Sequence, residues 1–127
     1  MAELLAIALG GALGALARHG LTNLTSALMG AHFPWGTLVV NVLGSLAIGV
    51  VFVLLVEKNL FSLVWRSALI VGFLGAMTTF STFSLQTIHL LQEGRWLAAG
   101  GYAMSSLFIC LLATSAGIVL GRQLGSV

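Results

Sequence analysis

The chain has 127 residues, of which 59% are hydrophobic and only 6% are charged. A water-soluble domain of this length needs far more charged side chains on its surface, so the composition excludes that class. The net charge of +2 argues against a nucleic-acid partner, and a single cysteine excludes an internal disulfide bond. We predict an all-α integral membrane protein in which residues 1–127 form a single domain of four transmembrane helices.

The first predicted helix covers residues 3–21 and carries Gly10 and Gly14 at a spacing that lets membrane helices approach closely. Arg18 follows on the same face, and we expect it to face protein, because a charge inside a membrane is costly. Snorkelling of Arg18 to the membrane surface is the alternative. The stretch TNLTSALMGAHFP, residues 22–34, is rich in Thr, Asn, Ser and Gly and ends in proline, so we expect a loop there.

The second predicted helix covers residues 35–56, and its single amide side chain is Asn41. At helical spacing, Asn41 shares a face with Thr37, Gly44 and Ser45. Two roles fit this position. Asn41 can form an interhelical hydrogen bond, as Asn often does in membranes, or it can be a donor that lines a polar path.

The third predicted helix, residues 66–91, contains the run GFLGAMTTFSTFS. Gly72 and Gly75 weaken a helix, and the Thr and Ser side chains that follow can satisfy backbone groups freed by a break. A broken helix at the membrane midplane exposes carbonyl oxygens that can hold a small cation. We therefore predict that this helix is broken.

Beyond the break, residues three apart lie on nearly the same face of the helix. The pairs on three such faces are Thr79 with Thr82, Phe80 with Phe83, and Ser81 with Ser84. The edge of a phenyl ring is electropositive, so rings beside hydroxyl donors can meet an anion without a fixed positive charge. The alternative is that the rings pack on neighbouring helices while the hydroxyls bond to their own turn.

The fourth predicted helix, residues 97–121, carries a series of uncharged donors spaced by four, namely Tyr102, Ser106, Cys110 and Thr114. Such a series indicates either a lined polar track or a tolerant helix interface. The tryptophans lie at the starts of the second, third and fourth predicted helices, which is typical of an aromatic belt at the membrane surface.

Four spans place both termini and the 57–66 connection on one side, with Lys58, Arg66 and Arg122. The other side has Arg95 and, near a helix end, Arg18. This small bias fits either a single orientation or insertion in both orientations with head-to-tail pairing. Because four helices enclose little volume, we expect a working pathway to need a dimer.

The three glutamates lie at the ends of the predicted spans, so no carboxylate is expected deep in the membrane. This argues against proton-coupled drug export. Paired carboxylates and clusters of His, Cys and Asp are also missing, so we predict that the chain is not an enzyme. A path of neutral donors suits a small anion that must shed its water.

The chain resembles the Fluc family of small fluoride channels over essentially its whole length, through the stretches GGALGALAR, GTLVVNVLGSLAIG, GAMTTFSTFS and LLQEGRW. The resemblance implies an antiparallel, dual-topology homodimer that lets fluoride leave the cytoplasm passively. It also implies a multi-pass protein of a bacterial inner membrane, with fluoride and lipid as its partners.

Site residues follow from the same resemblance. Gly75 and Thr78 match positions whose backbone carbonyls hold a sodium ion between the subunits, and Arg18 matches a helix 1 arginine to which we assign a structural role. We place the fluoride pore along residues of the last three helices, which are Asn41, Phe80, Ser81, Thr82, Phe83, Ser84, Tyr102, Ser106, Cys110 and Thr114.

Three residues depart from the family pattern. Gln86 stands where many members have glutamate, Cys110 where serine is common, and Ala76 where a second glycine is common. Two other classes remain as alternatives: a small four-helix multidrug-type exporter, and a membrane assembly subunit that transports nothing.

Overall fold

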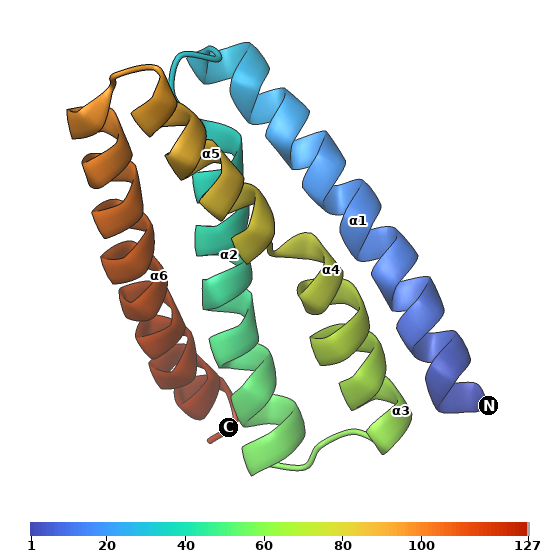
Figure 1. Cartoon of the computed structure of the whole chain (residues 1–127). Helices are drawn as coiled ribbons and strands as arrows, with labels where there is room; N and C mark the ends of the chain where they lie inside the picture. Colours follow the sequence, from blue (N-terminus) through green and yellow to red (C-terminus); the bar gives the residue numbers. More distant parts are fainter. Residues whose placement is uncertain (127) are drawn as a thin grey trace.

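The computed structural model describes residues 1–126, and every regular element within them is a helix (Figure 1). The elements are α1 (Ala2–Met29), α2 (Trp35–Phe52), the π-helical turn η1 (Val53–Glu57), α3 (Leu63–Arg66), the π-helical segment η2 (Ser67–Leu74), α4 (Gly75–Met77), α5 (Phe80–Gln92) and α6 (Trp96–Leu124). They combine into four segments long and apolar enough to cross a membrane: Ala2–Met29, Trp35–Glu57, Leu63–Gln92 and Trp96–Leu124. The predicted all-α class with four spans is confirmed.

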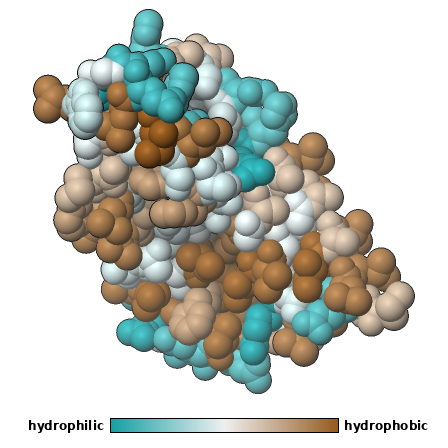
Figure 2. All heavy atoms as spheres, in the orientation of Figure 1, coloured by the Kyte–Doolittle hydropathy of each residue, from teal (hydrophilic) through white to brown (hydrophobic). Residues whose placement is uncertain are grey.

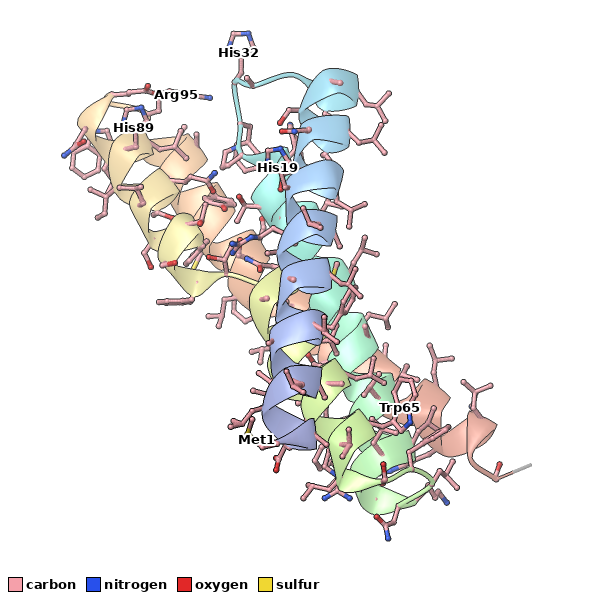
Figure 3. The ribbon with its side chains drawn as sticks, turned by 90° about the vertical axis from the view of Figure 1, so that its right-hand side faces the viewer. Met1, His19, His32, Trp65, His89 and Arg95 are labelled. Carbon is pink, nitrogen blue, oxygen red and sulfur yellow. The ribbon has the colours of Figure 1, made fainter. Side chains whose placement is uncertain are left out.

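The surface is that of a multi-pass membrane protein. Large apolar side chains are exposed along the helices, and Leu97 is 94% exposed. In Figure 2 the hydrophilic surface gathers at the upper and lower ends, with a mostly hydrophobic surface between them. Figure 3 places Met1 and Trp65 near one end, and His32, His89 and Arg95 near the other.

The first helix is longer than predicted. The expectation of a loop over residues 22–34 was wrong for residues 22–29, because α1 continues to Met29. Two polar side chains of this stretch bond within the helix: Thr25 Oγ1 donates to the Leu21 carbonyl at 2.7 Å, and Asn23 Nδ2 lies 3.1 Å from His19 Nε2. The residue that follows the helix, Gly30, has a φ of 84°, which favours glycine.

Glycines let the helices approach closely. A side chain at Gly14 on α1 would collide with the Phe73 carbonyl on η2, and one at Gly117 on α6 would collide with the Leu46 carbonyl on α2. These contacts bring α1 against the first half of the third span and α6 against α2. They are the close contacts that small residues permit between membrane helices.

The third span changes neighbours halfway. Its first half, from α3 to α4, packs along α1, while α5 leans across toward α6 (Figure 1). The buried side chains of Val40, Leu74 and Met77 form a cluster around the point of change. The change of neighbour occurs where the helix is interrupted, and the candidate site lies there.

Candidate functional site

The third span is interrupted at two residues. The α4 helix ends at Met77, Thr78 and Thr79 have extended backbones, and α5 begins at Phe80. Gly72 and Gly75, which the sequence indicated as weak points, are themselves helical. The interruption therefore falls after the glycines, within the run of hydroxyl side chains.

Asn41 on α2 pairs with the backbone of Thr79 in both directions. Its Nδ2 donates to the Thr79 carbonyl at 3.0 Å, and the Thr79 N–H donates to Asn41 Oδ1 at 2.8 Å. In a continuous helix the Thr79 N–H would donate to the Gly75 carbonyl instead. Of the two roles open to Asn41, the structure thus shows the interhelical hydrogen bond, and Asn41 also lines the groove described below.

Thr79 caps the second half of the span. Its Oγ1 accepts a hydrogen bond from the Thr82 N–H at 3.2 Å and lies within 3.2 Å of the hydroxyls of Ser81 and Thr82. Thr79 and Thr82 are therefore neighbours through a helix cap, because Thr79 itself is not helical. Ser84 Oγ donates to the Phe80 carbonyl at 2.9 Å, so its hydroxyl is bonded within its own turn.

Aromatic rings form a series beside the break. The ring centroids of Phe80 and Phe83 are 5.4 Å apart, those of Phe83 and Tyr102 5.1 Å, and those of Tyr102 and Phe33 5.4 Å in an edge-on arrangement. Phe80 is 78% exposed, whereas Tyr102 is fully buried. The Phe80 end of the series therefore faces out of the subunit.

A groove of about 610 Å³ opens along the break, between α2, the third span and α6. The structure brings seven of the predicted site residues to its lining, which are Asn41, Gly75, Thr78, Phe80, Phe83, Ser106 and Cys110. Ser81 does not line the groove but is hydrogen-bonded to the lining residue Thr79. All of the lining residues, which come from the described part of the chain, are uncharged.

The four hydrogen-bond donors spaced by four on α6 have different surroundings. Ser106 and Cys110 line the groove, and Ser106 Oγ is buried without a hydrogen-bond partner within residues 1–126. Tyr102 instead donates to Gln86 Oε1 at 2.8 Å. The carbonyl of Thr114 lies where α6 meets Gly49 of α2. The two ends of the series therefore serve helix contacts, and its middle faces the groove.

A smaller cavity of about 280 Å³ lies on the other side of Thr79, lined by Ala15, Arg18, His19, Thr22, Thr37, Val40, Thr79, Thr82 and Gln86. Arg18 is half-buried here, in a mostly polar setting. Sequence reasoning gave no role to Thr22, although it follows Arg18 by one helical turn, and that spacing could have indicated it. Thr79 lines both cavities and separates them.

At the end of the molecule opposite Met1, charged side chains partly neutralise one another. Arg95 donates to the His32 carbonyl, and Glu93 lies 3.1 Å from His89 Nε2 and 3.7 Å from Arg95. These groups lie beside a hollow of about 770 Å³. Within residues 1–126 there is no group of three or more His, Cys, Asp or Glu side chains that could hold a metal ion.

Together, the fold and the groove define a small multi-pass membrane protein organised around an interrupted third span. Residues 5–118 match the family model described as CrcB-like protein, Camphor Resistance (CrcB). The chain therefore belongs to the CrcB-like family.

Relatives in this family are similar over nearly their whole length. The chain is 50% identical over 120 residues to the fluoride-specific ion channel FluC of Hahella chejuensis, covering 94% of each chain. It is 47% identical over 116 residues to the protein of that name from Magnetococcus marinus, covering 91% of this chain and 94% of the relative. The Geobacter sulfurreducens protein of that name is 45% identical over 124 residues, covering 98% of this chain and all of the relative. The family predicted from the sequence is confirmed.

Proposed function

We propose that the chain is a fluoride-selective channel that lets fluoride leave the cytoplasm passively and so lowers its toxicity. The observation that supports this most directly is the groove along the break, whose lining is entirely uncharged yet contains hydroxyl, thiol and amide groups beside two phenyl rings. The relatives are named as channels for the same ion, and none of these names describes an enzyme.

The groove offers replacements for the water that fluoride must lose. Ser106 Oγ is buried and has no hydrogen-bond partner among residues 1–126, so its O–H is available to donate. The edges of Phe80 and Phe83 are electropositive and lie beside it in the same groove. Once a second subunit covers the groove, hydrogen bonds inside it would be stronger than in water, because the local dielectric constant would be low.

The working form in this proposal is an antiparallel homodimer in a bacterial inner membrane. Phe80 and Gly75, both exposed in one subunit, border the groove and would be covered by a second copy. Both termini lie at one end of the molecule (Figure 1), the end of Lys58, Arg66 and Arg122. The excess of positive charge at that end is small, which favours insertion in both orientations.

A sodium ion at the dimer interface completes the proposal. The Thr79 N–H bonds to Asn41, which leaves the Gly75 carbonyl without its helical donor. Gly75 and Thr78 both line the groove, and backbone carbonyl oxygens are ligands that hard cations prefer. When bound, sodium would supply a positive charge that links the carbonyl dipoles of the two subunits. Arg18, half-buried in the smaller cavity, has a structural role in this proposal.

Efflux from liposomes tests the function. Protein reconstituted into vesicles loaded with fluoride is expected to release it rapidly, as recorded by a fluoride electrode, and to retain chloride in a parallel preparation. Protein-free vesicles are the control. Release only under an imposed proton gradient would indicate the multidrug-type exporter, and no release under any condition would indicate the non-transporting subunit.

Prolonged removal of sodium tests the cation. We expect fluoride release to fall slowly when the purified protein is kept with N-methylglucamine in place of sodium, because the carbonyl oxygens of Gly75 and Thr78 would lose the cation that they bind. Returning sodium before reconstitution should restore the rate. Equal rates after both treatments would contradict a functional sodium site at Gly75 and Thr78.

A further inference from the structure

The amide of Asn41 is almost fully used by one backbone position. Its oxygen accepts from the Thr79 N–H at 2.8 Å, and one of its N–H groups donates to the Thr79 carbonyl at 3.0 Å. These two bonds fix which way the amide points, and they leave one N–H and one lone pair of the oxygen for other partners. A side chain held in this way presents its remaining N–H in a fixed direction.

A second residue of α2, Gly44, contacts Thr78, the other extended residue of the break. Gly44 lies one turn after Asn41, and a side chain there would collide with Cγ2 of Thr78. Because Gly44 has no side chain, the side chain of Thr78 has room beside α2, while Asn41 is hydrogen-bonded to Thr79. Two positions of α2 that lie one turn apart therefore contact the two extended residues of the third span.

We propose that Asn41 is a positioning residue that holds the interruption of the third span open, with Gly44 providing the space beside it. By accepting the Thr79 N–H, Asn41 keeps the Gly75 carbonyl free and lets Thr79 cap α5, the helix that carries Phe80 and Phe83. This role is separate from any contact that the remaining amide N–H makes with an ion in the groove. The part of this inference that concerns sodium rests on the proposed function, and the part that concerns the break does not.

Hydrogen–deuterium exchange of the full-length protein tests the break directly. Asn41→Leu has a similar shape and no amide, so the Thr79 N–H loses its acceptor. We expect exchange of the peptide covering residues 77–83 to differ at least about tenfold from that of the natural chain: faster if this N–H is left unpaired, slower if the break closes onto the Gly75 carbonyl. Ser45→Ala is the matched control, because Ser45 lines the same groove one turn from Asn41. It should leave exchange unchanged. Equal exchange in Asn41→Leu and the natural chain would overturn the proposal.

Asn41→Asp is a second variant, which keeps the test decisive if Asn41→Leu does not fold. Its carboxyl group keeps the acceptor for the Thr79 N–H and loses the amide donor, so we expect exchange between those of the natural chain and Asn41→Leu. The rise in Tm on adding sodium is the second measurement. It should be present in Ser45→Ala and lost in Asn41→Leu. A full sodium-dependent rise in Asn41→Leu combined with lost fluoride release would mean that Asn41 acts on the ion itself, and would overturn the positioning role.

The two hypotheses fail separately. A natural chain that releases no fluoride contradicts the proposed channel, whatever the exchange data show. Protection of residues 77–83 that depends on Asn41 would still support the positioning role in that case, because exchange is measured without fluoride.

Discussion

Phe80 and Phe83 lie on one helix but in different surroundings. Phe80 is 78% exposed in the subunit, whereas the ring of Phe83 also lies against Tyr102. The residue types that border the groove follow from the sequence, because hydroxyls, an amide and phenyl rings are conspicuous in an apolar span. Their partners do not follow from it. Asn41 and Thr79 are 38 positions apart, and local spacing carries no information on how two helices align.

Replacing either ring tests the role of its edge. We expect Phe80→Ile and Phe83→Ile to slow fluoride release by about tenfold or more, a barrier increase of about 1.4 kcal/mol, because an aliphatic side chain has no electropositive edge. Efflux from liposomes measures the rate, and gel filtration verifies that the dimer survives. Phe83→Ile should also lower Tm more than Phe80→Ile, since it loses a ring contact inside the subunit. Unchanged efflux in both variants would remove the ring edges from the mechanism.

The partly buried hydrogen bond between Tyr102 and Gln86 joins α6 to α5. Tyr102→Phe should lower the free energy of unfolding by about 1 kcal/mol, because Gln86 Oε1 loses its donor in a partly buried setting. The double variant Tyr102→Phe with Gln86→Leu should recover part of that loss, since neither polar partner remains. Thermal unfolding in detergent measures both. Strictly additive losses would show that the two groups are not coupled.

At the scale of the helices, the length of α1 and the position of the break differ from what composition indicated. Thr, Asn and Ser suggested a loop at residues 22–29, but Thr25 bonds to the preceding turn and the helix continues. Gly72 and Gly75 suggested a break near them, yet Gly72 packs tightly against α1 and remains helical. In both cases tertiary packing and side-chain bonding override local propensity.

Glycine contacts between α1 and η2 provide a quantitative test. Gly14→Ala should cost about 1–3 kcal/mol of stability, because the added methyl would meet the Phe73 carbonyl and push the helices apart. Gly20→Ala on the same helix is the control. Its methyl would meet nothing within 4 Å. It should be neutral or stabilising by up to about 1 kcal/mol, through helix propensity alone. Equal Tm values for the two variants would contradict this account of the packing.

At the scale of the whole molecule, the connections and the termini divide the charges between two ends. The bidentate contact of Arg122 with Glu57 offsets one positive charge at the end of the termini. At the opposite end Arg95 makes a single, longer contact with Glu93, at 3.7 Å. The four-span arrangement was predictable, because long apolar runs and terminal tryptophans mark membrane helices. The pairing of two subunits remains a prediction, since it depends on surfaces that one chain leaves open.

Added lysines test the antiparallel arrangement. Ser62→Lys with Gln123→Lys adds charge at one end, and Met29→Lys with Gln92→Lys adds it at the other. All four positions are exposed. Each variant alone should insert in one orientation and lose fluoride release, because antiparallel partners are then missing. Co-expression of the two variants should restore release. Full activity of either variant alone would contradict an antiparallel dimer.

The interruption of the third span also has a consequence for biosynthesis. The α5 helix has 13 residues and rises about 20 Å, which is less than the roughly 30 Å hydrocarbon core of a bilayer. Both halves must therefore enter together, and the N–H and carbonyl of Thr79 need hydrogen-bond partners inside the membrane. The ribosome makes Asn41 before Thr79, so the amide that bonds to the Thr79 N–H and carbonyl is synthesised first, in the preceding helix. The order of synthesis thus delivers the acceptor ahead of the segment that depends on it.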